Sequence, residues 1–428
     1  MAAPISRRTV LAVGAGAAAG LSVPGTTAHA DGHATTRVRF TLNARVLDGG
    51  EQITSLTLHT ARLGPIDPAG LTTGTFSVHA RATSPVPVAE GDVIFGEYDL
   101  DRTVTAVRLD HRGDIVLDLS HGEGVTGGGT LGYLAGRGRN VRLDLVYTLT
   151  QNTPLTSRKR HPVTVTDFVR NRRVSNPEVD AFSSHVSGSG MKYRLYSPTG
   201  PHSSRSARRG RHPLIVWLHG GGEGASLPDD YYDNETTLRA NRGALGFATP
   251  EAQRIFGGAY VLVPQSTSAW MQDGPRFAPL IHEIIGDVVR GNRVDRDRIY
   301  VAGCSNGGYM SMKMTSVYPS LFAASVPICG VVTSFPSGGA PLLPDAELAK
   351  ISTPTWLVAS RDDPTVDPRA NTAHAHDLIP GSLMTLYDHV TWNGYRFNGH
   401  WSWIYVARND PGSNGTHIWQ WMAAQQRH

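Results

Sequence analysis

One serine stands in a setting that points directly to chemistry. Gly303-Cys304-Ser305-Asn306-Gly307 has the form Gly-x-Ser-x-Gly. Glycines two positions before and after a serine permit the sharp, strained turn that exposes its hydroxyl to a base and to backbone N–H donors. The motif is short, and in a chain with 47 glycines it also arises by chance, with a serine that only caps a helix. Its meaning therefore depends on the other parts that a serine nucleophile needs.

A nucleophilic serine needs a base, and His400 is the best candidate. It follows the last expected strand, and Gly399 gives its loop the freedom to reach back to Ser305. His389, at the end of a strand, is the serious competitor among the 18 histidines. Two further histidines, at 374 and 376, lie two apart on an expected helix, so their side chains diverge and their spacing suits a metal poorly.

The acid that orients the base has three candidates in one loop. Asp362, Asp363 and Asp367 all follow the apolar run 355–359. Asp363 is favoured because Val366 stands three residues after it, an Asp-x-x-Val spacing that hydrolase acids often show. Asp362 and Asp367 are more typical of turn or helix-capping residues.

Backbone donors for an oxyanion are expected at two places. The amide of Asn306, directly after the serine, is one. The run His219-Gly220-Gly221-Gly222-Glu223-Gly224 follows an apolar strand, and its glycines, Gly221 or Gly222 in particular, let a second N–H turn into the site. The run lacks the spacing of a nucleotide-binding loop. The sequence predicts neither a cofactor nor a metal.

The elements that must position these residues come from residues 176–428. Continuous apolar runs without alternation are typical of strands buried on both faces. A helical pattern over 280–289 separates two of these runs, which indicates βαβ units and a mostly parallel sheet flanked by helices. Ser305 falls at the carboxyl end of its strand, where such sheets carry active sites. The runs are 214–218, 259–263, 299–302, 323–328, 355–359 and 383–387, and residues 192–196 are expected to form an edge strand of the same sheet.

Residues 35–150 have a different pattern. Short runs alternate between apolar and polar residues with turn residues between them, which favours an antiparallel sandwich of immunoglobulin-like type. Residues 151–175 contain prolines and basic residues and are expected to be a linker or an edge-strand connection. Four histidines of the alternating region stand singly, without metal-ligand spacing: His59, His79, His111 and His121.

The first 30 residues predict export. Arg7 and Arg8 precede an uncharged Ala/Gly-rich run that ends in an A-x-A pattern at Ala28-His29-Ala30, as in a twin-arginine signal peptide. We therefore expect a secreted or cell-wall-associated protein without a membrane span. The formal net charge is only +4, and two of these charges belong to the signal, so nucleic acid is not an expected partner.

Two cysteines, Cys304 and Cys329, end strands that are expected to be neighbours. A disulfide beside the nucleophile would require Cα atoms within about 7 Å. Two buried free thiols are an equally good interpretation.

Together these motifs resemble the α/β-hydrolase superfamily. His-Gly-Gly-Gly at 219–222, Val-Pro-Gln at 263–265, Gly-x-Ser-x-Gly at 303–307, Asp363-Pro364-Thr365-Val366 and Gly399-His400-Trp401-Ser402-Trp403 are most similar to its polyhydroxybutyrate-depolymerase-like and feruloyl-esterase-like serine esterases. The alternating region resembles the immunoglobulin-like domain of some secreted bacterial esterases of this group. The resemblance implies Ser305 as nucleophile, Asp363 as acid, His400 as base, and an oxyanion hole from Asn306 with Gly221 or Gly222.

The favoured function is a secreted serine carboxylesterase acting on a small or polymeric ester. A serine peptidase of prolyl-oligopeptidase type is the first alternative, and a non-catalytic wall- or glycan-binding protein the second. Aromatic residues are expected to line an acyl or aryl pocket unless they belong to the core, namely Trp270, Tyr309, Trp401 and Trp403. The N-terminal domain is expected to contact either the substrate or its own catalytic domain.

Overall fold

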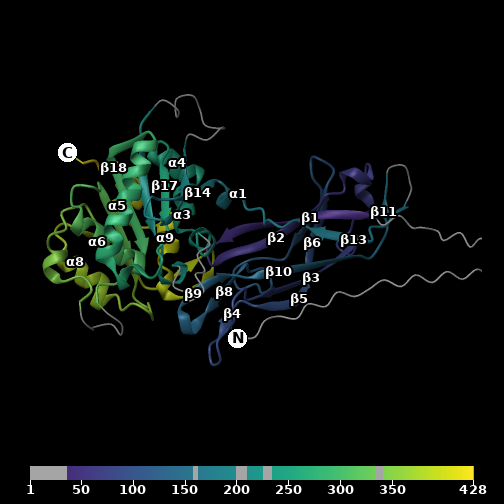
Figure 1. The fold of residues 1–428 in the computed structure, drawn as a ribbon, viewed down its shortest axis with the longest axis horizontal. Coiled ribbons are helices and arrows are strands. Elements are labelled where there is room, and N and C mark those ends of the chain that lie inside the picture. Colours follow the sequence, from purple (N-terminus) through teal and green to yellow (C-terminus); the bar gives the residue numbers. More distant parts are fainter. Residues whose placement is uncertain (1–35, 158–161, 199–209, 225–233, 334–340, 428) are drawn as a thin grey trace, which may run out of the picture. The chain divides into compact units, whose positions relative to one another are not determined.

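An eight-stranded sheet organises the C-terminal region of the computed structural model, in the order β14-β15-β17-β16-β18-β19-β20-β21. Figure 1 labels β14, β17 and β18 of this sheet. β15 runs antiparallel to both of its neighbours, and the other adjacent pairs are parallel. The structure describes residues 36–157, 162–198, 210–224, 234–333 and 341–427, so the predicted signal over 1–30 lies outside them. The strands are β14 Phe182–Val186, β15 Lys192–Tyr196, β16 His212–Leu218, β17 Tyr260–Pro264, β18 Val294–Cys304, β19 Ala324–Ile328, β20 Trp356–Ser360 and β21 Leu383–Tyr387.

Both faces of this sheet are covered, which explains its continuous apolar runs. Every residue of β16 is buried. Along β18, Ile299 and Val301 pack into one core, whereas Tyr300 and Ala302 pack into another on the opposite face. All seven strands expected from the sequence are confirmed, but the strand over 192–196, β15, is not at the edge, because β14 pairs with its outer side. The two-sided burial is the reason that these strands read as unbroken apolar segments.

Helices supply the two covering layers. The predicted helix over 280–289 is confirmed as part of α5 Gly274–Gly291. Asp273 caps the start of this helix, because its side chain accepts a hydrogen bond from the N–H of Arg276. α6 Asn306–Val317 follows β18 directly and is buried over most of its length. The shorter helices are α1 Pro177–Asp180, α2 Thr236–Arg239, α3 Gly243–Phe247, α4 Pro250–Phe256, α7 Asp345–Leu348, α8 His374–Leu378, α9 Trp403–Ala407 and α10 Ile418–Ala424.

The N-terminal region is all-β. A five-stranded sheet, β13-β1-β2-β7-β6, and a three-stranded sheet, β10-β3-β5, contribute side chains to one shared core. A further sheet, β4-β8-β9, extends from them. The strands are β1 Arg37–Leu47, β2 Gly50–Leu58, β3 Phe76–Thr83, β4 Ile94–Phe95, β5 Tyr98–Arg102, β6 Val104–Leu109, β7 Ile115–Leu119, β8 Leu131–Leu134, β9 Arg139–Arg142, β10 Asp144–Gln151 and β13 Asp167–Arg170.

The range 151–175 is not wholly a linker. β11 Leu155–Thr156 and β12 Pro162–Val163 form a small ladder, and β13 pairs in parallel with β1 as an edge strand. These strands agree with the expected edge-strand connection, and they show that the expected linker is wrong for much of this range. The pairing of β13 with β1 joins residues that are far apart in the sequence. A side-chain contact adds to it, since Arg37 of β1 donates to the carboxylate of Asp167 at 2.6 Å.

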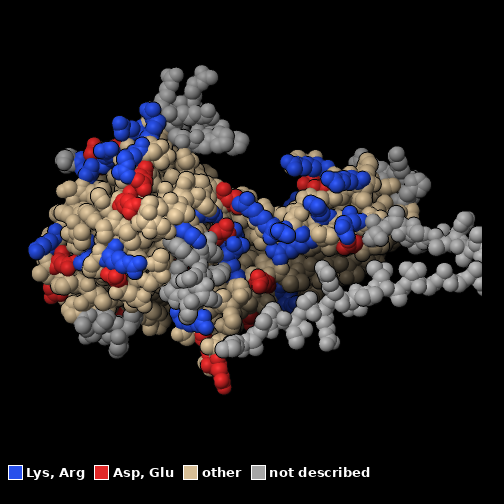
Figure 2. Space-filling model, in the orientation of Figure 1, with Lys and Arg blue, Asp and Glu red and all other residues tan. Residues whose placement is uncertain are grey.

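Ion pairs and hydrogen bonds join the N-terminal region to the catalytic region. The buried Arg239 of α2 pairs with the buried Glu51 of β2. Arg408 donates to both carboxylate oxygens of Asp48, at 3.0 and 2.9 Å. Elsewhere on the catalytic region, acidic and basic side chains are interspersed over the face that Figure 2 shows. None of the helices among the described residues is long and apolar enough to span a membrane.

Candidate active site

Ser305 lies at a strained turn between β18 and α6. Its backbone has φ 56° and ψ −114°, in a region that residues with a side chain rarely adopt. Its N–H donates to the carbonyl of Ile328 at 2.7 Å, which fixes the turn to the neighbouring strand. Glycine is required on both sides, because a Cβ at Gly307 would stand 1.9 Å from the carbonyl oxygen of Leu218 and one at Gly303 2.5 Å from that of Gly307.

Asp363 and His400 form a buried pair. Nδ1 of His400 lies 2.8 Å from Oδ2 of Asp363, whose side chain is fully buried. The other oxygen, Oδ1, accepts from the N–H groups of Thr365 and Val366 at 2.8 and 2.9 Å, so the Asp-x-x-Val spacing is a turn that holds the carboxylate still. With Nδ1 engaged, Nε2 is the nitrogen left to serve a nucleophile.

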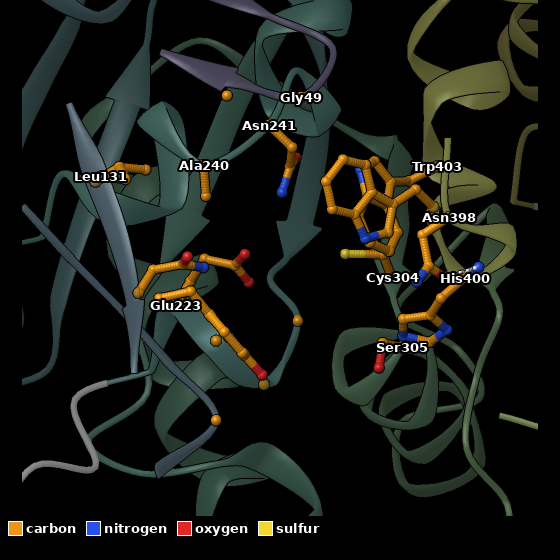
Figure 3. Close-up of a pocket in the computed structure, with 18 of the residues that line it drawn as sticks. Gly49, Leu131, Glu223, Ala240, Asn241, Cys304, Ser305, Asn398, His400 and Trp403 are labelled. Atoms are coloured by element: carbon orange, nitrogen blue, oxygen red, sulfur yellow. Dashed lines mark hydrogen bonds between the residues drawn. The ribbon is translucent and has the colours of Figure 1, made fainter. Parts of the chain in front are cut away.

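Figure 3 places Ser305 and His400 next to one another on the same side of the pocket. Among the hydrogen bonds of the described residues, none joins the Ser305 hydroxyl to the imidazole. In the absence of substrate such contacts are often long and tighten only in the complex. The pair and the serine thus come together at the carboxyl ends of β18 and β20, as the sequence predicted.

The competing acids and histidines are engaged elsewhere. Asp362 accepts from Ser360 and, at 2.8 Å, from Arg396. His389 contacts the same Arg396 at 3.0 Å and lies half exposed. Asp367 caps the turn after it by accepting from two backbone N–H groups. None of these three contacts His400 in the described hydrogen bonds.

The electrostatics of His400 favour its charged form. Burial lowers the pKa of His400, but contacts with Cys329 and with the Asp363 carboxylate outweigh this and raise that pKa to about 10. The Sγ of Cys329 and one ligand atom each of Asp363 and His400 lie within 4.8 Å of one another. Thiolate, imidazole and carboxylate are donors that zinc accepts, so among the described residues these three are a set that could hold a metal ion.

The glycine loop after β16 is held by a buried histidine. His219 donates from Nδ1 to the carbonyl of Gly220 at 2.6 Å, and its Nε2 accepts from the N–H of Ser266 at 3.0 Å. Burial lowers the pKa of His219 to about 3, so the ring is neutral and can do both. Gly220, Gly221 and Gly222 consequently line the pocket together with Ser305 and Asn306.

Two of the expected pocket aromatics belong to the core instead. Trp270 is fully buried, and its Nε1–H donates to the carbonyl of His219 at 3.1 Å. Tyr309 is 3% exposed and packs against α5, so close that a Cβ at Gly274 would stand 2.1 Å from its hydroxyl oxygen. Both support the loops around the pocket without lining it. Trp401 and Trp403 do line it.

The pocket has a volume of about 670 Å³, and the N-terminal region forms one of its walls. Residues of β2, β8 and β9 face the loops that carry Ser305 and His400. The sequence analysis expected the N-terminal domain to contact the substrate or its own catalytic domain but named none of these residues, because they come from a different part of the chain. The wall includes Gly49, Glu51, Phe95, Leu131, Tyr133 and Asn140.

The two cysteines are free, so the disulfide considered from the sequence does not form. In the sheet Cys304 pairs with Ile328 and not with Cys329, which places the thiols out of register. Cys304 faces the glycine loop, since a Cβ at Gly220 would lie 3.6 Å from its Sγ. Cys329 instead contacts the His400 pair.

The sheet order, the strained serine turn and the Asp–His pair at the strand ends have the arrangement of the α/β-hydrolase fold. The relatives of the chain agree with that fold. Residues 285–335, which contain the serine turn, match the family described as "Prolyl oligopeptidase family".

Two known proteins are similar to larger parts of the chain. NocK of Nocardia uniformis subsp. tsuyamanensis, provisionally named as an esterase, is 26% identical over 169 residues, which cover 40% of this chain and 46% of that protein. The chain thus matches less than half the length of this curated relative. A crystal structure of a thermostable esterase shares 24% identity with a TM-score of 0.69, and the match covers 91% of this chain and 99% of the other. That likeness shows a common fold across both regions.

Proposed function

We propose that this protein is a serine carboxylesterase that forms an acyl-enzyme on Ser305. The observation that carries the proposal is the 2.8 Å pair of His400 and Asp363 beside a serine held in a strained turn. A serine in that setting needs only a neutral imidazole to take its proton. The similarity to two esterases supports ester substrates.

In the proposed reaction, Oγ of Ser305 attacks the ester carbonyl carbon while its proton passes to Nε2 of His400. The N–H groups of Asn306 and of Gly221 or Gly222 donate to the resulting oxyanion. His400 then returns the proton to the leaving alcohol. Water, deprotonated by the same nitrogen, then attacks the acyl-enzyme. As the bond between Oγ of Ser305 and the acyl carbon breaks and the acid leaves, Nε2 of His400 returns the proton to Oγ. Asp363 holds the ring and stabilises its charged form throughout.

Substitution of the nucleophile tests this function. Ser305→Ala should lower kcat for p-nitrophenyl butyrate by at least about 10,000-fold, because the substitution removes the hydroxyl on which the acyl-enzyme forms. Circular dichroism and the urea midpoint of the variant should match the wild type. Undiminished turnover by the folded variant would contradict the assignment.

A serine peptidase of prolyl-oligopeptidase type remains the second candidate, and the family match at residues 285–335 favours it. The two activities share the nucleophile and differ in the leaving group. A comparison of p-nitrophenyl esters with prolyl p-nitroanilides on the same preparation separates them. We expect the esters to be turned over with the higher kcat/KM.

The classification of the N-terminal region as immunoglobulin-like and the export of the protein are also proposals. The two facing β-sheets support the first. The twin-arginine pattern and the A-x-A site at 28–30 support the second. Mass spectrometry of protein recovered from the culture medium should find an N-terminus near Asp31.

A further inference from the structure

Glu223 is a carboxyl group in the pocket wall that the proposed reaction does not use. It ends the glycine loop, in the turn Gly221–Glu223, and is 7% exposed. Figure 3 shows it across the pocket from Ser305 and His400. A buried carboxylate normally requires a partner, so its surroundings indicate what that partner is.

The carboxyl of Glu223 is incompletely satisfied within the protein. Its Oε2 is buried and has no hydrogen-bond partner among the described residues. Nδ1 of His219 is 3.9 Å away, but that nitrogen already donates to Gly220 and the ring is neutral. Nε2 of Gln265 donates to the backbone carbonyl of Glu223. A buried acceptor without a donor is destabilising, and a substrate donor would offset this cost.

The carboxyl lies close to the reacting centre. A Cβ at Gly220 would stand 3.1 Å from Oε2 of Glu223 and 3.6 Å from Sγ of Cys304, the residue before the nucleophile. The carboxyl is also near enough to raise the pKa of the Cys304 thiol, after the larger effect of burial. A substrate group that reaches Glu223 would therefore be near the scissile bond.

Two polar side chains of the N-terminal region flank this corner. A Cβ at Gly222 would lie 2.7 Å from the amide nitrogen of Asn140 and 3.7 Å from the ring of Tyr133. Tyr133 is 41% exposed and lines the pocket. Asn140 and Tyr133 thus lie beside Gly222, the residue before Glu223, and all of them line the pocket.

The protonation of Glu223 suits a polar ligand. Burial raises the pKa of Glu223 to about 7, against the opposing effects of the Gly220 N–H and of Arg139. At neutral pH the group is present in both forms, and both accept a hydrogen bond.

We propose that Glu223 is a specificity-determining residue that accepts a hydrogen bond from a donor on the substrate, a hydroxyl or an amine, close to the scissile ester. This inference rests on the proposed esterase function and names a substrate class for it: esters with a hydrogen-bond donor near the carbonyl. The donor completes the buried Oε2, and Tyr133 and Asn140 border the same space.

Matched esters test the proposal on both sides of the scissile bond. On the acyl side, p-nitrophenyl butyrate is compared with the 3-hydroxybutyrate and 3-aminobutyrate esters; on the alcohol side, propyl acetate is compared with 2-hydroxyethyl acetate by acid release. The wild type should prefer a donor-bearing ester on at least one side by about 10- to 100-fold in kcat/KM, the equivalent of one hydrogen bond to a carboxylate.

Glu223→Ala should abolish this preference, because kcat/KM for the donor-bearing ester falls further than kcat/KM for the plain ester. Glu223→Gln separates the two donors, because an amide oxygen still accepts from a hydroxyl but no longer offers a charge to an ammonium group. Glu251→Gln is the matched control, since Glu251 is exposed in the first turn of α4. It should retain the wild-type preference.

Two results would contradict the inference and leave the proposed function intact. One is that the wild type shows no preference for the donor-bearing esters. The other is that Glu223→Ala lowers kcat/KM equally for all esters, which is what a purely structural role predicts. Absence of Ser305-dependent turnover of every ester would instead contradict the proposed function itself.

Discussion

Asp363 differs from the other two acids of its loop in what its carboxylate contacts. One carboxylate oxygen of Asp363 faces Nδ1 of His400, and the other accepts hydrogen bonds from two backbone N–H groups. Asp362 instead accepts a hydrogen bond from Arg396, and Asp367 accepts from backbone N–H groups of the turn after it. Asp363→Asn should therefore lower kcat by about 10,000-fold, since an amide favours the wrong tautomer of the ring. Asp362→Asn and Asp367→Asn should keep kcat within the same order of magnitude. Equal losses in the three variants would contradict the assignment.

Cys329 gives His400 an additional neighbour, and its effect appears in the pH dependence. The base acts only when neutral, so kcat/KM should rise with pH towards the raised pKa of His400, about 10. Cys329 is one of the contacts that raise this pKa. Cys329→Ala should lower it and move the rising limb of the profile to lower pH. A limb that stays in place in the folded variant would show that the thiol does not influence the base.

At the scale of elements, the turn between β18 and α6 depends on the absence of a side chain. A Cβ at Gly307 would overlap the Leu218 carbonyl of β16, which belongs to backbone and cannot rotate away. Gly307→Ala should lower the free energy of unfolding by about 1–3 kcal/mol and displace the serine, with a loss of activity. Gly291→Ala, at the end of α5 in open space, should change stability by less than about 1 kcal/mol. Urea unfolding of both variants measures the difference.

The elements that the sequence predicted well are those whose burial is uniform along the chain. β16 and β18 are apolar on both faces, so their residue types alone identify them. The serine turn and the Asp363 loop were recognisable because their geometry demands glycine or an Asp-x-x-Val spacing at fixed positions.

Features that depend on distant residues left no local pattern. β13 is held by its pairing with β1, and the residues of either segment alone do not indicate this pairing. Trp270 and Tyr309 were misplaced because an aromatic residue near a nucleophile in sequence can point into the pocket or into the core, and only packing decides which. Glu223 stood in the glycine loop, but its unpaired oxygen depends on the neighbours that folding brings to it.

At the scale of the whole molecule, Glu51 connects the two regions. Its buried carboxylate accepts from Thr130 and Asn176 at 2.7 and 2.6 Å and pairs with Arg239 of α2. Glu51→Ala removes one of the two carboxylates that contact the buried Arg239 and leaves Glu235 as the other. Breaking a buried ion pair in this way should lower the free energy of unfolding by about 3–5 kcal/mol.

Tryptophan fluorescence shows whether the catalytic region loses stability in this variant. All eight lie at position 217 or later, so their fluorescence follows the catalytic region alone, while Glu51 belongs to the N-terminal region. If the ion pair couples the two regions, Glu51→Ala should lower the urea midpoint measured by tryptophan fluorescence, and Glu251→Ala, at an exposed site, should not. An unchanged urea midpoint in Glu51→Ala would mean that the catalytic region folds without the support of the N-terminal sheet. It would also mean that the position of the pocket wall formed by this sheet does not depend on the ion pair.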